Sequence, residues 1–273
     1  MREMLIGLEP ATVLTMKGMR FVRHRPMRAA ILLICCSLAA CHRNDAENDV
    51  KAASAVVPPT VLQHELVFQR QQGGRPQLAL QAMPPGSRDG LVIIGVGRGI
   101  ASATQSPFDT TSGILATAVG EPHRYTKYPD SGTAVYMLAS RHDDAPRRIA
   151  VNLPPQDEVT LAALQVERSR LQDAVWNEAY PGKILHRQRV RSGKVRTTGP
   201  ATLIAFWWGD AGVRGRKTAV PGQGFQLLDA VLEEGALVQC AVAVKEVSAA
   251  GEYEVTWTAT PRQAAQLWLM ALQ

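Results

Sequence analysis

The sequence predicts an all-β protein built as an antiparallel, jelly-roll-like β-sandwich with little helix. Short apolar segments of strand length recur along the second part of the chain, and near the C-terminus Tyr253, Val255 and Trp257 alternate with polar residues. Turn-forming residues separate these segments: Gly73-Gly74, Pro84-Pro85-Gly86, Asp130-Ser131-Gly132, Ser192-Gly193, Pro221-Gly222 and Ala250-Gly251.

Thirteen segments have the composition and length of strands. In chain order they are Val61–Arg70, Gln77–Ala82, Leu91–Arg98, Thr133–Ser140, Arg148–Leu153, Glu158–Glu167, Ile184–Arg191, Lys194–Thr197, Thr202–Trp208, Phe225–Leu232, Leu237–Val247, Tyr253–Ala259 and Ala264–Leu272. One short helix is predicted over Arg170–Ala179, ended by Pro181-Gly182. Roughly 210 residues is a usual size for one all-β domain, so residues 61–273 are predicted to form a single β-sandwich domain. No internal repeat is visible.

The N-terminal segment has the pattern of a secretion signal. Basic residues between Arg20 and Arg28 precede the apolar run Ala29–Ala40. This run is shorter than the roughly 20 residues that a membrane-spanning helix needs, so residues 1–40 are predicted to be a removable signal peptide. The sequence leaves open whether translation starts at Met1, Met16 or Met19.

The end of this signal, Leu38-Ala39-Ala40-Cys41, resembles the lipobox of bacterial lipoproteins. The resemblance implies a covalent acyl and diacylglycerol lipid on Cys41. Since His42 follows in place of an aspartate, it also implies the outer membrane of a Gram-negative bacterium, facing the periplasm or the cell surface. The alternatives are an ordinary signal peptide with a coincidental cysteine and an apolar buried helix. Anchorage becomes lasting only with more than one acyl chain, which the modified cysteine of this class would supply.

Residues 41–60 are small and polar and are predicted to be a flexible tether, which would keep the body within a few tens of ångströms of the lipid surface.

The chain has 30 basic and 24 acidic residues, but residues 1–40 contain six of the basic and two of the acidic ones. From Cys41 onward 24 basic residues face 22 acidic ones, a net charge of +2. Nucleic-acid binding is therefore not expected.

The body also resembles secreted bacterial and phage-tail-like β-sandwich modules. The resemblance is carried by residues 89–96, 131–138, 192–205 and 247–258. It implies a jelly-roll-like sandwich of the kind found in extracellular interaction proteins. It implies no catalytic residue.

One strand carries a stripe of positive charge. Alternate residues Arg187, Arg189 and Arg191 are predicted to share a face, with Lys194 and Arg196 close behind. Guanidinium groups in such a row can bind anionic glycans, lipid headgroups or phosphate-bearing polymers. The alternative is an edge strand that positive charge protects against aggregation.

Aromatic residues suggest a second binding surface. Trp176 and Tyr180 lie near the end of the predicted helix, and Trp208 points to the opposite face of its strand from Trp207. Trp176, Tyr180 and Trp208 are predicted to form an aromatic platform for sugar rings, with core packing as the alternative.

Three further motifs favour structure over chemistry. The run Gly95-Val-Gly-Arg-Gly99 lacks the third glycine of a dinucleotide-binding loop and indicates a glycine-rich strand end or bulge instead. Adjacent Asp143 and Asp144 indicate a solvated hairpin turn more readily than a calcium site. Cys240, the one cysteine after Cys41, is predicted to be a buried apolar side chain.

Taken together, these features predict a lipid-anchored cell-envelope protein that is not an enzyme and acts as a binding or structural module. The expected partners are the membrane, through the anchor, and an envelope glycan or another envelope protein. No metal, and no cofactor other than the lipid, is expected. The alternative is an envelope hydrolase that assembles its site from scattered His, Asp and Ser residues, with His64, His123, His142 and His186 as candidates. Convergence of His123, His142 or His186 with a Ser or Asp in one concave pocket would favour the hydrolase, and scattering of these histidines on the rim would disfavour it.

Overall fold

The computed structural model describes residues 56–70, 73–100, 105–179, 188–209, 217–261 and 263–273, which belong to one compact unit spanning residues 53–273. All regular elements in these ranges are β-strands. No helix among them has the length and hydrophobicity to cross a bilayer. The predicted signal peptide, Cys41 and the tether up to residue 55 lie outside the described residues.

The first half of the body is a sandwich of two sheets. One has the order β1-β9-β3-β7-β5, with β6 also paired to β7, and the other has the order β2-β8-β4. The bounds are β1 (Thr60–Arg70), β2 (Gln77–Leu80), β3 (Gly90–Arg98), β4 (Phe108–Asp109), β5 (Thr117–Ala118), β6 (His123–Arg124), β7 (Gly132–Ser140), β8 (Arg147–Ala150) and β9 (Glu158–Glu167).

The second half is a sandwich with the same plan. Its large sheet has the order β10-β19-β13-β16-β15 and its small sheet β11-β18-β14, and a ribbon of β12 and β17 is added. The bounds are β10 (Leu171–Ala179), β11 (Gln188–Arg191), β12 (Val195–Thr197), β13 (Ala201–Gly209), β14 (Thr218–Pro221), β15 (Gln226–Val231), β16 (Gln239–Val247), β17 (Gly251–Tyr253), β18 (Thr256–Thr260) and β19 (Ala265–Leu272).

Apart from β6 and the β12–β17 ribbon, the two strand orders match element for element, so the body is a tandem repeat of one sandwich. In each half the first strand pairs with the last and the second with the next to last, while β3 pairs with β7 and its counterpart β13 pairs with β16. This nested antiparallel pairing is that of a jelly roll. The all-β, jelly-roll-like prediction is therefore confirmed, whereas the prediction of one sandwich without a repeat is corrected to two sandwiches in one unit.

Matching β-bulges fix the correspondence residue by residue. The register of β1 against β9 shifts at Leu62, and that of β10 against β19 shifts at Gln172. Four residues after each bulge, the first sheet has the row Leu66, Ala162, Gly95, Val135 and the second has Trp176, Trp268, Phe206, Val242. The first row is therefore small where the second is large.

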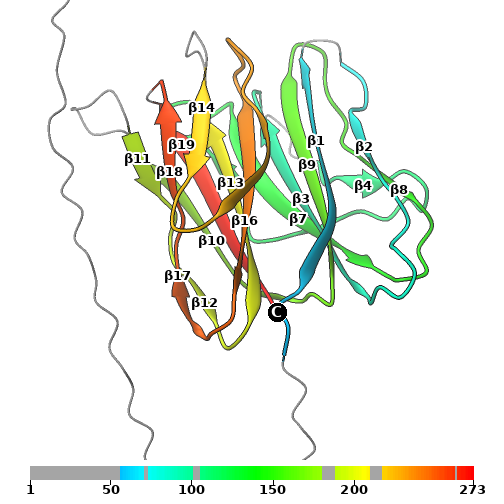
Figure 1. Cartoon of the computed structure of the whole chain (residues 1–273). Helices are drawn as coiled ribbons and strands as arrows, with labels where there is room; N and C mark the ends of the chain where they lie inside the picture. The colour runs from blue at the N-terminus through cyan, green and yellow to red at the C-terminus, as the bar shows by residue number, and fades with distance from the viewer. Residues whose placement is uncertain (1–55, 71–72, 101–104, 180–187, 210–216, 262) are drawn as a thin grey trace, which may run out of the picture. The chain divides into compact units, whose positions relative to one another are not determined.

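The large sheets pack face to face, and each small sheet covers the outer face of its own large sheet (Figure 1). The central cluster joins Ile93 and Leu164 of the first repeat to Phe206, Trp208 and Met270 of the second. Both faces of each large sheet are thus covered. Their strands accordingly read as continuous apolar runs rather than as alternating ones.

Glycines in β3 make room for the aromatic residues of β13. A Cβ on Gly95 would lie 2.8 Å from Cε1 of Phe206, and one on Gly97 would lie 2.6 Å from Cδ1 and Nε1 of Trp208. Both distances are far below van der Waals contact. The glycine-rich strand end predicted here is therefore explained by this close approach of the two sheets.

Arg98 ends β3 as a buried ion pair. It donates hydrogen bonds to Asp157 from Nε, at 2.8 Å, and from Nη2, and both side chains are 2% exposed. The second oxygen of Asp157 accepts the backbone N–H groups of Ile100 and Glu158, each at 2.7 Å. The carboxylate therefore holds together the two strand ends that meet here.

The predicted helix over Arg170–Ala179 is wrong, because this segment is strand β10, paired along its length with β19. Its apolar residues serve two cores: Leu171, Ala174 and Trp176 pack on the central cluster, and Val175 and Ala179 on the outer one. With the bulge near its start, this distribution imitates the spacing of a helix.

Candidate binding sites

The basic stripe lies on β11 and β12, at one edge of the second repeat. Arg191 pairs with Glu254 at 2.9 Å, while Lys194 and Arg196 both pair with Glu252, at 3.2 and 2.9 Å. Hydrogen bonds from Lys194 and Arg196 lower the pKa of Glu252. The two glutamates thus offset half of the charge of the four described basic residues.

The position of this stripe agrees with the protective alternative as well as with binding. β11 is an edge of the sheet β11-β18-β14, and Arg189 on it is exposed. Exposed ion pairs contribute about 0–1 kcal/mol, so an anionic polymer could displace the glutamates at small cost. Arg187 lies outside the described residues.

The predicted aromatic platform is not formed as expected. Trp208 is completely buried and donates its indole N–H to Thr160 Oγ1 at 3.1 Å, so its place in the platform is wrong. The large sheet is covered on both faces, which buries Trp207 and Trp208 alike. Trp176 is half-buried in β10, and Tyr180 lies outside the described residues.

Trp176 instead closes one edge of the interface between the repeats. Its ring stacks on the imidazole of His123 in β6, with centroids 3.8 Å apart and planes within 10°. Burial lowers the pKa of His123, and the carboxylate of Glu121 opposes this in part. Close by, Thr126 donates its hydroxyl to Glu178 of β10 at 2.7 Å.

Two histidines of the hydrolase alternative, His123 and His142, lie far apart. His123 pairs with Thr133 near the start of β7, whereas His142 follows the end of β7. At about 3.3 Å per strand residue, the length of β7 separates them by more than roughly 20 Å. His64 lies within β1, and His186 lies outside the described residues.

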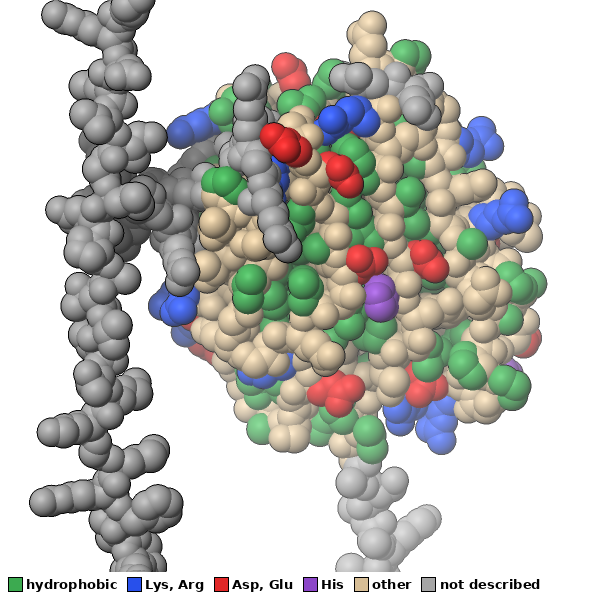
Figure 2. Space-filling view, turned by 45° about the horizontal axis from the view of Figure 1, so that its top comes forward, with side chains coloured by type: hydrophobic (Ala, Val, Ile, Leu, Met, Phe, Trp, Pro, Cys, Tyr) green, Lys and Arg blue, Asp and Glu red, His purple; other side chains and the backbone are tan. Residues whose placement is uncertain are grey.

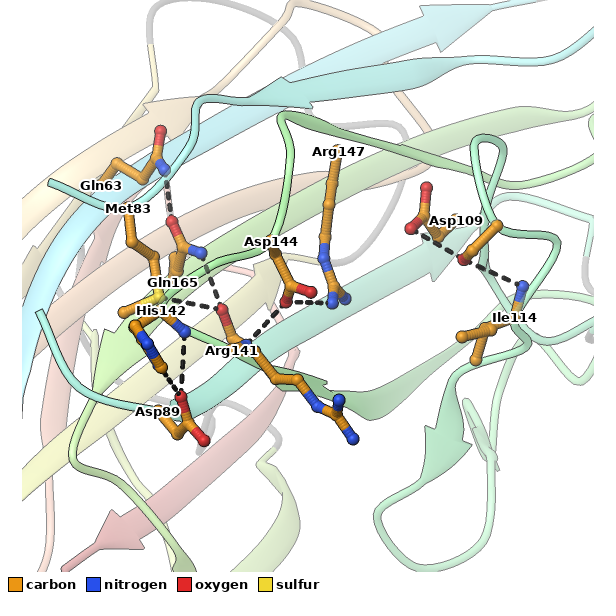
Figure 3. Close-up of polar contacts among 12 residues, drawn as sticks. Gln63, Met83, Asp89, Asp109, Ile114, Arg141, His142, Asp144, Arg147 and Gln165 are labelled. Carbon is orange, nitrogen blue, oxygen red and sulfur yellow. Dashed lines mark hydrogen bonds and ion pairs between the residues drawn. The ribbon is translucent and has the colours of Figure 1, made fainter. Parts of the chain in front are cut away.

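His142 forms an exposed pair with Asp89 (Figure 3). Asp89 Oδ1 accepts a hydrogen bond from the backbone N–H of His142 at 2.9 Å and lies 2.8 Å from Nδ1 of the same residue. These hydrogen bonds lower the pKa of Asp89 and raise that of His142. The pair fixes the turn after β7 onto the segment before β3.

The same turn continues into a second polar cluster. Asp144 accepts the backbone N–H of Arg141 at 2.6 Å and forms an ion pair with Arg147, which is partly buried. The turn is thus closed by its own carboxylate, as the hairpin interpretation of Asp143 and Asp144 expected. Among the described residues, no group of three or more His, Cys, Asp or Glu side chains is placed to hold a metal ion.

A groove runs between this turn and the loop after β4. One cavity of about 370 Å³ is lined by Ile114, Leu138, Ala139, Arg141, Asp144 and Arg147, and an adjoining one of about 190 Å³ continues along Asp109 and Ser112. Asp109 is buried and accepts the Thr111 N–H and the Ser112 hydroxyl, each at 2.9 Å, which fixes the loop. Ile114 is 56% exposed beside the ion pair. No sequence pattern indicated this groove, because its walls come from separate segments of the chain.

Cys240 is fully buried in the central cluster, as predicted, and burial raises the pKa of its thiol well above the usual value.

Figure 2 turns the top of Figure 1 toward the viewer and shows Lys and Arg side chains spread around the rim of this face. The chain matches no protein-family model, and no curated protein or solved structure matches it.

Proposed function

We propose that this chain is a lipid-anchored protein of the bacterial outer membrane whose double sandwich acts as a non-enzymatic binding module, facing the periplasm or the cell surface. The anchor rests on Leu38-Ala39-Ala40-Cys41 and on the polar segment that follows it. The observation that favours binding over hydrolysis is the exposure of the His142–Asp89 pair, at 63% and 65%, with no serine of the described residues hydrogen-bonded to the imidazole.

The groove beside Arg147 is the surface that best fits a partner. Ile114 offers an exposed apolar contact on a loop fixed by Asp109, and Arg141 and the Asp144–Arg147 pair offer charged hydrogen-bonding groups next to it. An apolar contact on a rigid loop with polar groups at its border is the usual composition of a recognition site. An envelope glycan or a segment of another envelope protein would meet both kinds of group there.

Metabolic labelling with palmitate tests the anchor. The wild-type chain should incorporate label and fractionate with membranes, and Cys41→Ser should lose both properties. An unlabelled wild-type chain, or unchanged membrane fractionation of Cys41→Ser, would overturn the anchoring.

A glycan array probed with the full-length Cys41→Ser chain tests the binding role. Binding should be lost in Ile114→Asp and kept in Val220→Asp, which places the same charge at a position equally exposed, at 56%, in the second repeat. Equal binding by both variants would remove the groove from the proposal. Cleavage products among the bound glycans, detected by mass spectrometry, would replace the binding role with the hydrolase.

A further inference from the structure

A pocket opens where the two repeats join. It has a volume of about 490 Å³ and is lined by Arg88, Asp89, Gly90, Leu91, Arg168, Ser169, Arg170 and Gln273. Its walls are tied together: Ser169 Oγ accepts the Leu91 N–H at 3.0 Å, and Arg170 and Gln273 exchange backbone hydrogen bonds of 2.7 and 2.9 Å. The pocket is therefore part of the folded body and not a gap between loops.

Three arginines, Arg88, Arg168 and Arg170, supply positive charge to the pocket lining. Arg88 and Arg170 are exposed, and Arg168 is 31% exposed. Nη2 of Arg168 donates to Thr60 Oγ1 at 3.0 Å and lies 3.4 Å from Glu167, while its Nε is buried and has no hydrogen-bond partner among the described residues.

The acidic groups beside the pocket are already engaged. Asp89 is held by His142, and Glu167 accepts the Arg88 N–H at 3.2 Å in addition to its contact with Arg168. Guanidinium groups that keep free donors in a pocket are suited to the tetrahedral oxygens of a phosphate group.

The pocket lies at the end of the body from which the N-terminal segment departs. Arg168 in its wall binds Thr60 at the start of β1, and Thr202 Oγ1 of the second repeat bonds the Pro59 carbonyl. Figure 1 shows β1 beginning next to the C-terminus, at the same end. A chain anchored through Cys41 by the predicted tether would therefore keep this end within reach of the bilayer.

We infer that the junction pocket binds a phosphate group, presented by an anionic lipid headgroup of the membrane to which the chain is anchored. The orientation rests on the proposed anchoring, whereas the chemistry of the pocket does not. Free inorganic phosphate has the same recognised group and is the second source to distinguish.

Vesicle binding by the chain from His42 onward tests the inference, because it contains the whole compact unit and lacks both the acyl chains and the basic, apolar segment 1–40. At low salt it should bind vesicles containing phosphatidylglycerol and not vesicles of phosphatidylcholine alone. Arg88→Gln with Arg170→Gln should weaken this binding roughly 30-fold, from the usual contribution of each basic residue near an anionic surface. Arg124→Gln with Arg148→Gln removes the same charge from exposed strand positions elsewhere and should leave binding nearly unchanged.

Equal weakening by both double variants, or no binding to either vesicle, would overturn the inference. Competition by inorganic phosphate, with saturable phosphate binding by calorimetry, would support the pocket but reassign its source to free phosphate. Palmitate labelling of the wild-type chain reports on anchoring independently, so failure of the pocket and failure of the proposed function are distinguishable.

Discussion

Gly97→Ala should destabilise the body by forcing apart the two large sheets. The added Cβ would lie 2.6 Å from Cδ1 and Nε1 of Trp208 and 2.6 Å from Cγ1 of Val238, about 1 Å inside van der Waals contact. Overpacking of this kind costs about 1–3 kcal/mol. The lower chain entropy of alanine in the unfolded state returns about 0.4–1 kcal/mol. Strain on the hydrogen bond from Trp208 to Thr160 adds about 1 kcal/mol.

The expected net loss is therefore about 1–3.6 kcal/mol, or a fall in Tm of roughly 2–14 °C for a body of this size. Urea unfolding followed by far-ultraviolet circular dichroism measures it. Gly199→Ala is the matched control, because its Cβ meets only Nε2 of Gln273, at an ordinary 3.6 Å. This control should be neutral or slightly stabilising.

A double-mutant cycle identifies the cause. Trp208→Leu alone should be destabilising, but in the Gly97→Ala background it relieves the overlap. The double variant should therefore lose at least about 1 kcal/mol less stability than the sum of the losses of the two single variants. Additive costs, or a Gly97→Ala chain as stable as Gly199→Ala, would refute the packing argument.

Three further predictions concern groups that are partly or fully buried. Burial lowers the pKa of His123 in the folded state below 6.5, so the unfolded chain takes up a proton at a higher pH than the folded chain does. Stability should therefore fall as the pH drops below about 6.5. Urea midpoints measured at neutral and mildly acidic pH should differ less for His123→Phe than for the wild-type chain. Asp157→Asn leaves the buried Arg98 guanidinium without its counter-charge and should cost about 3–5 kcal/mol by the same denaturation assay, and a loss under about 1 kcal/mol would contradict this. Cys240 should react with a thiol reagent only in denaturant, as followed by mass spectrometry of its peptide, and equal labelling of the native chain would contradict its burial.

Most strands could be predicted from the sequence, because strand-length apolar segments end at turn residues. The predicted bounds of Glu158–Glu167 coincide with β9. The repeat could not be predicted, since equivalent positions differ in size and type: Leu66 corresponds to Trp176 and Gly95 to Phe206. The common plan lies in strand pairing, to which side-chain identity gives little access.

The same limit applies to the candidate sites. Alternation correctly placed Arg191 on an exposed face, but nothing in the local pattern showed that Glu254 would lie 2.9 Å away. The burial of Trp208 followed from a second sheet that covers its strand, which a single strand pattern does not encode. The junction pocket draws on three segments, around residues 88–91, 168–170 and 273, that only the fold brings together.

The facing rows around Gly95 and Phe206 differ in side-chain size, so the two repeats pack together as two different surfaces. If the first sandwich met a copy of itself, Gly95 would oppose Gly95 and leave a void. If the second did so, Phe206 would collide with its counterpart. Each half therefore has a packing surface complementary to the other half and not to itself. Neither half could be replaced by a second copy of its neighbour, although both have the same strand order.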